Sequence, residues 1–195
     1  MLVLASSSLA RLSMLTAAGV PFEVEAPRVD EDAAKGAFAA QGLNARDLAD
    51  ALAELKAVRV SMSRPGDIVL GCDQTLMIDN GVMLDKPGND VAAHLHMLSG
   101  KTHHLYSAVV AVENGQPVWR CVEKATLTMR ALSDTFIQEY VAREAENVAG
   151  CVGGYRIEGL GAQLFSRIEG SHFTILGLPL LPLLAWLRVR GELTS

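Results

Sequence analysis

The sequence predicts a mixed α/β fold that contains hairpins. Short apolar runs suited to strands alternate along the 195 residues with segments of helical periodicity. Two Asn-Gly pairs, at 80–81 and 114–115, lie between apolar runs and indicate tight hairpin turns. Half of the residues are hydrophobic and only 20% are charged, which excludes disorder and supplies a core. The length fits one domain over residues 1–195, or two small lobes.

The first element is a strand over residues 2–5, an apolar run that ends at Ser6, Ser7 and Ser8. The helical pattern that follows ends at Gly19. A strand that enters a helix through hydroxyl residues leaves backbone N–H groups and a positive dipole end for an anion. Arg11, one turn into the helix, could add a bidentate grip on phosphate oxygens. An ordinary capped helix with a surface arginine fits the same spacing.

The middle of the chain predicts a long helix followed by a buried strand. The helix is expected over residues 44–63, with leucines on one stripe and Pro65 just after its end. Residues 67–72, DIVLGC, predict a strand too apolar for a solvated face, so it should lie centrally in the sheet. Asp73 follows that strand directly, at the edge where α/β sheets place ligands. A turn aspartate that caps the strand end is the alternative.

Both Asn-Gly pairs are expected to form type I′ turns, in which both central residues take positive φ. The first joins residues 75–79 to residues 82–84, and the second joins residues 105–112 to residues 118–129. The sequence therefore predicts two hairpins.

Three further helices complete the predicted fold. Two short helices are expected over residues 89–98 and 133–146, and each begins with an N-capping residue, Asn89 and Ser133. The longest apolar run, residues 175–187, predicts a buried C-terminal helix with a proline-marked start. Glycine and proline interrupt this run and it is too short to span a bilayer, so no membrane anchor is predicted.

The charge and the cysteines limit the partners and the compartment. Lys and Arg number 17 against 22 Asp and Glu, a net charge of −5 that excludes an overall-basic nucleic-acid binder and suits a small ligand. Cys72, Cys121 and Cys151 are an odd number without C-x-x-C spacing, so no disulfide framework is predicted. We expect a cytoplasmic protein that binds neither nucleic acid nor membrane.

Two acidic positions and two lysines complete the candidates for chemistry. Asp30 and Glu31 precede a helical segment, where they fit either first-turn acids or, with Asp73, oxygen ligands for magnesium. Lys56 lies beside an apolar helix stripe and Lys86 follows the first hairpin. A lone lysine is usually solvated, but this set matches what a polyphosphate and its metal require.

Taken together, these residues resemble the Maf family of nucleoside triphosphate pyrophosphatases. Six ordered blocks carry the resemblance: LASSSLAR at 4–11, VDE at 29–31, LAELKA at 52–57, GCDQTLMIDNGVMLDKP at 71–87, LSGKTHHLYSAV at 98–109 and GYRIEGLGAQLFSRIEGSHFTILGLPL at 154–180. The resemblance implies a mixed twisted sheet in two lobes around a deep cleft, as in inosine triphosphate pyrophosphatases. It also implies a divalent cation, Mg²⁺ or Mn²⁺, and commonly a homodimer.

The resemblance also implies roles for individual residues. The family's serine-and-arginine loop, expected on the triphosphate, matches Ser6, Ser8 and Arg11. Its charged active-site positions match Glu31, Lys56, Asp73 and Lys86. Asp73 matches the proton-acceptor aspartate, and Asp73 with Glu31 is expected to hold the metal. The reaction implied is hydrolysis of a nucleoside triphosphate to the monophosphate and pyrophosphate.

By the same resemblance, Gln74 and Glu158, with Cys151, are closer to the 7-methyl-GTP-preferring branch of the family than to the dTTP/UTP branch. Ala10 is a third specificity position, since it stands where members usually have an arginine or another large side chain thought to affect base choice. A carboxylate at 158 can accept hydrogen bonds from the N1–H and amine of guanine. In the alternative, Glu158 faces solvent or pairs with an arginine, and the enzyme has broad specificity or prefers dTTP and UTP. A competing class is a nucleotide-binding regulator, since the family is also associated with inhibition of septum formation.

Overall fold

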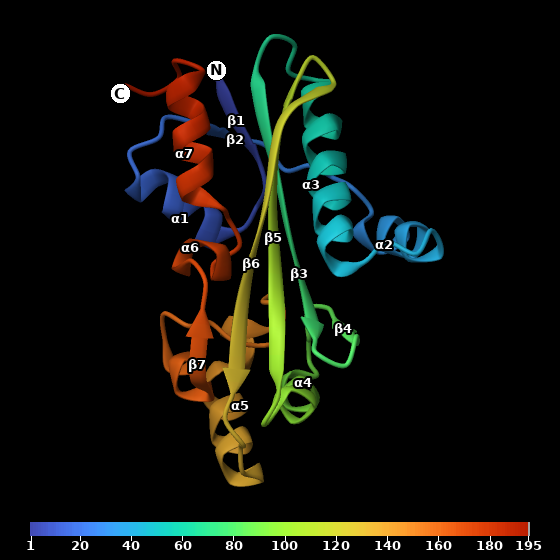
Figure 1. The fold of residues 1–195 in the computed structure, drawn as a ribbon, viewed down its shortest axis with the longest axis vertical. Coiled ribbons are helices and arrows are strands. Elements are labelled where there is room, and N and C mark those ends of the chain that lie inside the picture. Colours follow the sequence, from blue (N-terminus) through green and yellow to red (C-terminus); the bar gives the residue numbers. More distant parts are fainter. Residues whose placement is uncertain (195) are drawn as a thin grey trace. The chain divides into compact units, whose positions relative to one another are not determined.

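The computed structural model describes residues 1–194, which form a seven-stranded sheet with helices packed on it (Figure 1). The neighbours in the sheet run β2-β1-β3-β5-β6-β7, and β4 pairs with β3. The strands are β1 Leu2–Ala5, β2 Glu23–Val24, β3 Ile68–Ile78, β4 Met83–Leu84, β5 Thr102–Glu113, β6 Gln116–Met129 and β7 Phe165–Glu169. The helices are α1 Leu9–Ala17, α2 Glu31–Ala40, α3 Ala45–Ser61, α4 Val91–Leu98, α5 Asp134–Val148, α6 His172–Ile175 and α7 Leu180–Val189, with a 3₁₀ turn, η1, at Leu160–Leu164. The predicted fold class, a mixed α/β sheet, is confirmed.

The chain divides into two compact units, described separately below. Unit 1 comprises Met1–Gln74, Tyr106–Glu123 and the C-terminal part from Ser171. Unit 2 comprises Thr75–Leu105 and Lys124–Gly170.

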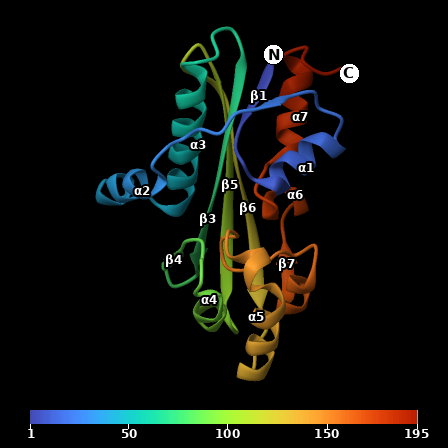
Figure 2. The ribbon, with the colours of Figure 1, turned by 180° about the vertical axis from the view of Figure 1, so that it is seen from behind.

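Unit 1 is built on parallel strands with helices on both faces. β1 pairs in parallel with β2 and with β3, and its last pair joins Ala5 to Gly71. Apolar residues of α1 and α7 pack on one face of these strands, and alanines of α3 pack on the other (Figure 2). Because both faces are covered, β3 is buried from Ile68 to Asp73. The central place predicted for this strand is confirmed.

Unit 2 is built on antiparallel pairs with α4 and α5. β6 pairs with β7 in antiparallel register, with an irregularity between Thr128 and Met129. The buried side chains of unit 2 include Leu76 of β3, Leu95 of α4 and Tyr140 of α5. The helices predicted over residues 89–98 and 133–146 correspond to α4 and α5.

Two predicted elements have wrong boundaries, and each error has a local cause. β3 does not end before Asp73 but continues to Ile78, because its second half pairs with β4. The apolar run 175–187 is not one helix: Gly177, at a φ of 96°, and the following Pro179 separate α6 from α7.

The two Asn-Gly turns also differ from each other. Asn114 and Gly115 both have positive φ, 51° and 77°, as a type I′ turn requires. In the other turn only Gly81 does, at 87°, and its N–H donates to the carbonyl of Ile78 at 2.8 Å. The hairpin prediction is confirmed at both places, but the type I′ turn at Asn80-Gly81 is wrong.

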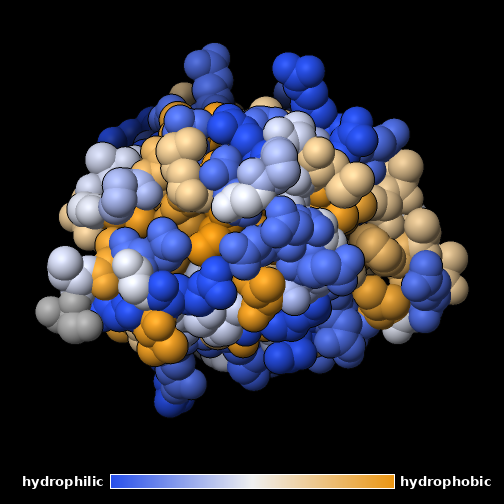
Figure 3. All heavy atoms as spheres, turned by 90° about the horizontal axis from the view of Figure 1, so that it is seen from above, coloured by the Kyte–Doolittle hydropathy of each residue, from blue (hydrophilic) through white to orange (hydrophobic). Residues whose placement is uncertain are grey.

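Within residues 1–194, no helix has the length and apolar character needed to cross a membrane. In the view of Figure 3, hydrophobic residues form scattered patches among hydrophilic ones.

Candidate active site

The centre of the candidate site is a lysine buried between two carboxylates. Lys56 Nζ lies 2.5 Å from Asp73 Oδ1 and 2.9 Å from Glu31 Oε1. Only 7% of the Lys56 side chain and 9% of the Asp73 side chain are exposed. A buried ammonium group requires such partners, since its desolvation would otherwise be very costly. The solvated-surface alternative for Lys56 is therefore wrong.

Close packing of α3 on β3 produces this pair. A Cβ on Gly71 would lie 2.0 Å from the carbonyl oxygen of Ala53, so only glycine allows the helix to approach the strand here. Ala53 and Ala57 are fully buried at the same contact. One turn of α3 thus sits against the strand, and the Lys56 side chain reaches Asp73.

Glu31 and Asp30 take different parts at the start of α2. Asp30 is the N-cap, and its Oδ1 accepts a hydrogen bond from the backbone N–H of Ala33 at 3.0 Å. Glu31, the first residue of the helix, contacts Lys56 instead. The first-turn alternative thus accounts for Asp30, while Glu31 joins the charged cluster.

Arg11 is anchored entirely by neutral oxygens. Its Nε donates to the carbonyl of Gly177 at 2.8 Å, and its Nη1 donates to the carbonyl of Cys72 at 3.1 Å and to Ser6 Oγ at 3.3 Å. Within residues 1–194, no carboxylate pairs with it. A guanidinium that is held in place while its charge is not neutralised suits an anionic ligand.

The serine loop supports Arg11 at the end of β1. Ser6 Oγ accepts from the backbone N–H of Ser8 at 3.2 Å as well as from Arg11. Ser8 occupies the N-cap position of α1 without a side-chain cap hydrogen bond. The last residue pair between β1 and β3 joins Ala5 to Gly71. Ser6 follows Ala5 directly, and β3 continues from Gly71 to Asp73, so both residues lie beyond this pair.

The thiol of Cys72, which precedes Asp73, is unreactive. Its side chain is fully buried, and burial raises the pKa of the thiol to about 11. The backbone carbonyl of Cys72, not its sulfur, contributes to the site by accepting from Arg11.

Two of the predicted specificity residues also lie in unit 1. The Gln74 Nε2 atom lies 2.9 Å from Ser107 Oγ, 3.0 Å from the carbonyl of Thr174 and 3.1 Å from that of Ile175. Ala10, in the first turn of α1, is partly exposed.

The remaining predicted residues belong to unit 2 and are more exposed. Lys86 follows β4, and its backbone N–H donates to Asp85 Oδ1 at 2.7 Å. Glu158 Oε1 lies 3.5 Å from Arg156 Nε, and both side chains are more than a third exposed. The arginine-paired alternative for Glu158 is thus what the structure shows. Burial raises the pKa of the nearby Cys151 thiol.

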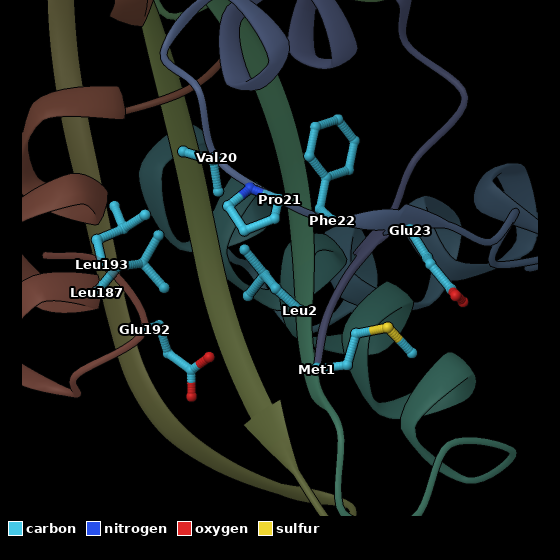
Figure 4. A pocket seen from close by; sticks show the side chains of 9 residues that line it. All are labelled: Met1, Leu2, Val20, Pro21, Phe22, Glu23, Leu187, Glu192 and Leu193. Carbon is cyan, nitrogen blue, oxygen red and sulfur yellow. The ribbon is translucent and has the colours of Figure 1, made fainter.

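An apolar pocket of about 310 Å³ lies at the other end of β1 (Figure 4). Leucine side chains face into it, and its acidic members are Glu23 and Glu192. A cavity that combines apolar walls with carboxylates does not suit a polyphosphate. It is lined by Met1, Leu2, Val20, Pro21, Phe22, Glu23, Leu187, Glu192 and Leu193.

Comparison with known proteins now adds the family. Residues 1–190 match the family model described as Maf-like protein. The chain belongs to the Maf family. The resemblance drawn from the six sequence blocks is therefore confirmed.

Relatives of this Maf protein carry a common name. It is 48% identical over 192 residues to a nucleoside triphosphate pyrophosphatase of Sphingopyxis alaskensis, with 97% of each chain covered. It is 50% identical to a protein of the same name from Ruegeria pomeroyi, with 100% of this chain and 98% of the relative covered. A dITP/XTP pyrophosphatase structure from Mycobacterium abscessus aligns with a TM-score of 0.45 at 16% identity, over 97% of this chain and 94% of that chain.

Glu31 and Asp73 are the residues of the Maf site that could hold a divalent metal ion. Within residues 1–194, no group of three or more His, Cys, Asp or Glu could hold a metal ion. Glu31 and Asp73 nevertheless both contact one cation, the ammonium of Lys56. Mg²⁺ is usually held by one or two carboxylates together with substrate phosphates, so this donor set suits it.

Sequence reasoning missed the polar residues behind the Maf site. Ser107 and Thr174 are both buried: Ser107 Oγ donates to the Thr174 carbonyl at 2.7 Å, and Thr174 Oγ1 donates to Glu123 Oε2 at 2.5 Å. In unit 2, the buried His103 Nε2 lies 2.6 Å from Tyr155 Oη. The sequence could have indicated these residues, because each is a hydroxyl or imidazole within an apolar run, where a buried polar group needs a hydrogen-bond partner.

Proposed function

We propose that this Maf protein hydrolyses nucleoside triphosphates to the monophosphate and pyrophosphate. The protein is a hydrolase that acts on phosphoric anhydrides. The observation that carries the proposal is the buried Lys56–Asp73 pair at 2.5 Å, with Glu31 beside it. One carboxylate there can accept a proton while cationic groups receive the charge of a polyphosphate.

Asp73 is the proton acceptor in this mechanism. It takes a proton from the attacking water, whose oxygen forms a bond to the α-phosphorus. The bond from the α-phosphorus to the bridging oxygen breaks, and that oxygen leaves with pyrophosphate. Lys56, at 2.5 Å, holds the Asp73 side chain in place before the substrate binds.

The other charged residues bind the triphosphate. Arg11, whose hydrogen-bond partners among residues 1–194 are neutral oxygens, contributes a guanidinium with its orientation already fixed. Ser6 and Ser8 line the same loop, and Lys86 of unit 2 supplies a further ammonium group. Glu31 and Asp73 would hold Mg²⁺ or Mn²⁺, which when bound neutralises phosphate charge and assists departure of pyrophosphate.

The preferred base in this proposal is 7-methylguanine. Glu158 supports it, since a carboxylate can accept from the N1–H and amine of a cationic guanine. Arg156 must then release Glu158 when the base binds, which a partly exposed pair at 3.5 Å can do at little cost. Gln74 matches the same branch of the family. Preference for dTTP or UTP is the alternative.

Three further features belong to the proposal. The enzyme works in the cytoplasm, which suits the three free cysteines among the described residues. It uses neither nucleic acid nor membrane as a partner, and it forms a homodimer. A regulator of septum formation that binds nucleotide without turnover is the alternative, but binding alone does not require Asp73 beside Lys56.

The test is a nucleotide panel. The purified protein is incubated with 7-methyl-GTP, GTP, UTP and dTTP at matched Mg²⁺, and monophosphate and pyrophosphate are quantified. Equal amounts of both products, with activity lost in EDTA and restored by Mg²⁺ or Mn²⁺, are expected. Release of orthophosphate, or binding of nucleotide without any turnover, would overturn the proposal.

A further inference from the structure

Gln74 directs its amide donors at the main chain instead of at open space. Its Nε2 has two hydrogens and three acceptors within 3.1 Å: Ser107 Oγ and the carbonyls of Thr174 and Ile175. Those carbonyls end helix α6. A side chain whose donors are all engaged in this way cannot offer them to the edge of a base.

The α6 carbonyls that accept from Gln74 are connected to Arg11 through the turn that follows α6. The carbonyl of Thr174 also accepts the backbone N–H of Gly177 at 3.1 Å, which closes the turn after α6. The carbonyl of Gly177 in turn accepts from Arg11 Nε at 2.8 Å. Three hydrogen bonds, through Thr174 and Gly177, therefore connect Gln74 to Arg11.

Other buried contacts make this turn stiff. Ser107 Oγ donates to the Thr174 carbonyl, and Thr174 Oγ1 donates to Glu123. Gly177 has a φ of 96°, a conformation that a residue with a side chain rarely adopts. The turn thus has one well-defined shape, and Arg11 binds to it.

We propose that Gln74 is a positioning residue for Arg11, acting through the turn from Thr174 to Gly177, and that it sets affinity for the triphosphate whatever the base. This inference rests on the proposed function. It replaces the role in base preference that the proposed function gives to Gln74 with a role in positioning Arg11. Binding of a ligand that has no base separates the two roles.

The first experiment uses Gln74→Met, which keeps the side-chain length and removes the donors. Titration calorimetry measures Kd for inorganic tripolyphosphate with Mg²⁺, and steady-state kinetics measures KM and kcat for 7-methyl-GTP, UTP and dTTP. We expect Kd and all three KM values to rise by a common factor of about ten, the size of a lost charge-assisted contact. Ratios between substrates should stay constant, and kcat should change less than KM.

A double-mutant cycle tests whether Gln74 acts through Arg11. In the Arg11→Ala background, adding Gln74→Met should weaken tripolyphosphate binding by less than twofold, because the group it positions is gone. Thr174→Val, which removes the hydroxyl that donates to Glu123, should weaken binding in the same manner, and Thr174→Ser should restore it. Circular dichroism melts identify any variant that fails to fold. If Gln74→Met fails to fold, the comparison of Thr174→Val with Thr174→Ser serves as the test.

Three results would overturn the inference: an altered ratio between nucleotides with an unchanged tripolyphosphate Kd, additive losses in the cycle, or failure of the wild-type protein to bind tripolyphosphate. A protein that binds tripolyphosphate with the expected coupling but hydrolyses no nucleotide would contradict the proposed function and leave the positioning role standing.

Discussion

The two units hold their predicted site residues in different ways. In unit 1, Lys56 and Asp73 are buried and joined at 2.5 Å, and main-chain carbonyls fix Arg11. In unit 2, Lys86 is exposed and Glu158 forms a partly exposed pair with Arg156 at 3.5 Å. The groups proposed to carry out the chemistry are thus buried and held by several contacts, while Lys86 and Glu158, which we propose contact the substrate, are exposed and able to move.

Removing Lys56 should have the largest effect of the changes that test this contrast. Lys56→Met leaves Asp73 and Glu31 without their shared cation in a buried place, which should lower the free energy of unfolding by about 3–5 kcal/mol. Urea denaturation measures the loss. Lys124→Met, at an exposed lysine, should change stability by less than about 0.5 kcal/mol. Equal small losses would mean that the Lys56 cluster is not a rigid, buried unit.

Asp73→Asn should preserve the fold and remove the proton acceptor. We expect kcat to fall by roughly 10²-fold or more at saturating Mg²⁺, with the thermal midpoint changed little, because Lys56 keeps Glu31 as its partner. Asp32→Asn, at an exposed position of α2, is the matched control. Activity of Asp73→Asn within a few-fold of wild type would remove Asp73 from the mechanism.

Lys86→Ala should weaken triphosphate binding without affecting stability. A desolvated, charge-assisted contact contributes on the order of 1.5–3 kcal/mol, so KM for the triphosphate should rise at least tenfold. Binding of the monophosphate should change much less, and Lys124→Ala should alter neither. Equal losses for both ligands would show that Lys86 contacts something other than the β- and γ-phosphates.

Glu158→Gln should have the smallest effect, on preference alone. The ratio of kcat/KM for 7-methyl-GTP to that for UTP should narrow by several-fold, since an amide can also donate to the uracil carbonyls. Glu169→Gln, which alters another surface acid paired with an arginine, should leave the ratio unchanged. A wild-type preference for dTTP, or an unchanged ratio in Glu158→Gln, would contradict the role of Glu158 in base choice.

Periodicity and capping predicted the elements that local sequence controls. Ser133 caps α5 as expected, and the helix that follows the serine loop begins at Leu9. The cap expected at Asn89 is wrong, since Asp90 occupies the N-cap position of α4 without a side-chain cap hydrogen bond. The identical Asn-Gly pairs form different turns, because two residues separate β5 from β6 whereas four residues, 79–82, separate β3 from β4. A dipeptide signals a turn, but the strands on either side decide its type.

The sequence could suggest the residues of the candidate site but not their geometry. The pattern placed Lys56 beside an apolar stripe, whereas its burial depends on the contact between Gly71 and Ala53, which are far apart in sequence. The hydrogen bonds of Gln74 reach Ile175, about half the chain away. Such long-range contacts leave no periodic signal in the sequence.

The bond that the enzyme breaks tests the central claim most directly. Hydrolysis of a nucleoside triphosphate is run in H₂¹⁸O with Mg²⁺, and the products are separated and weighed by mass spectrometry. If water attacks the α-phosphorus beside Asp73, one ¹⁸O atom enters the monophosphate and none enters pyrophosphate. Label in pyrophosphate would place the attack at the β-phosphorus and contradict the account.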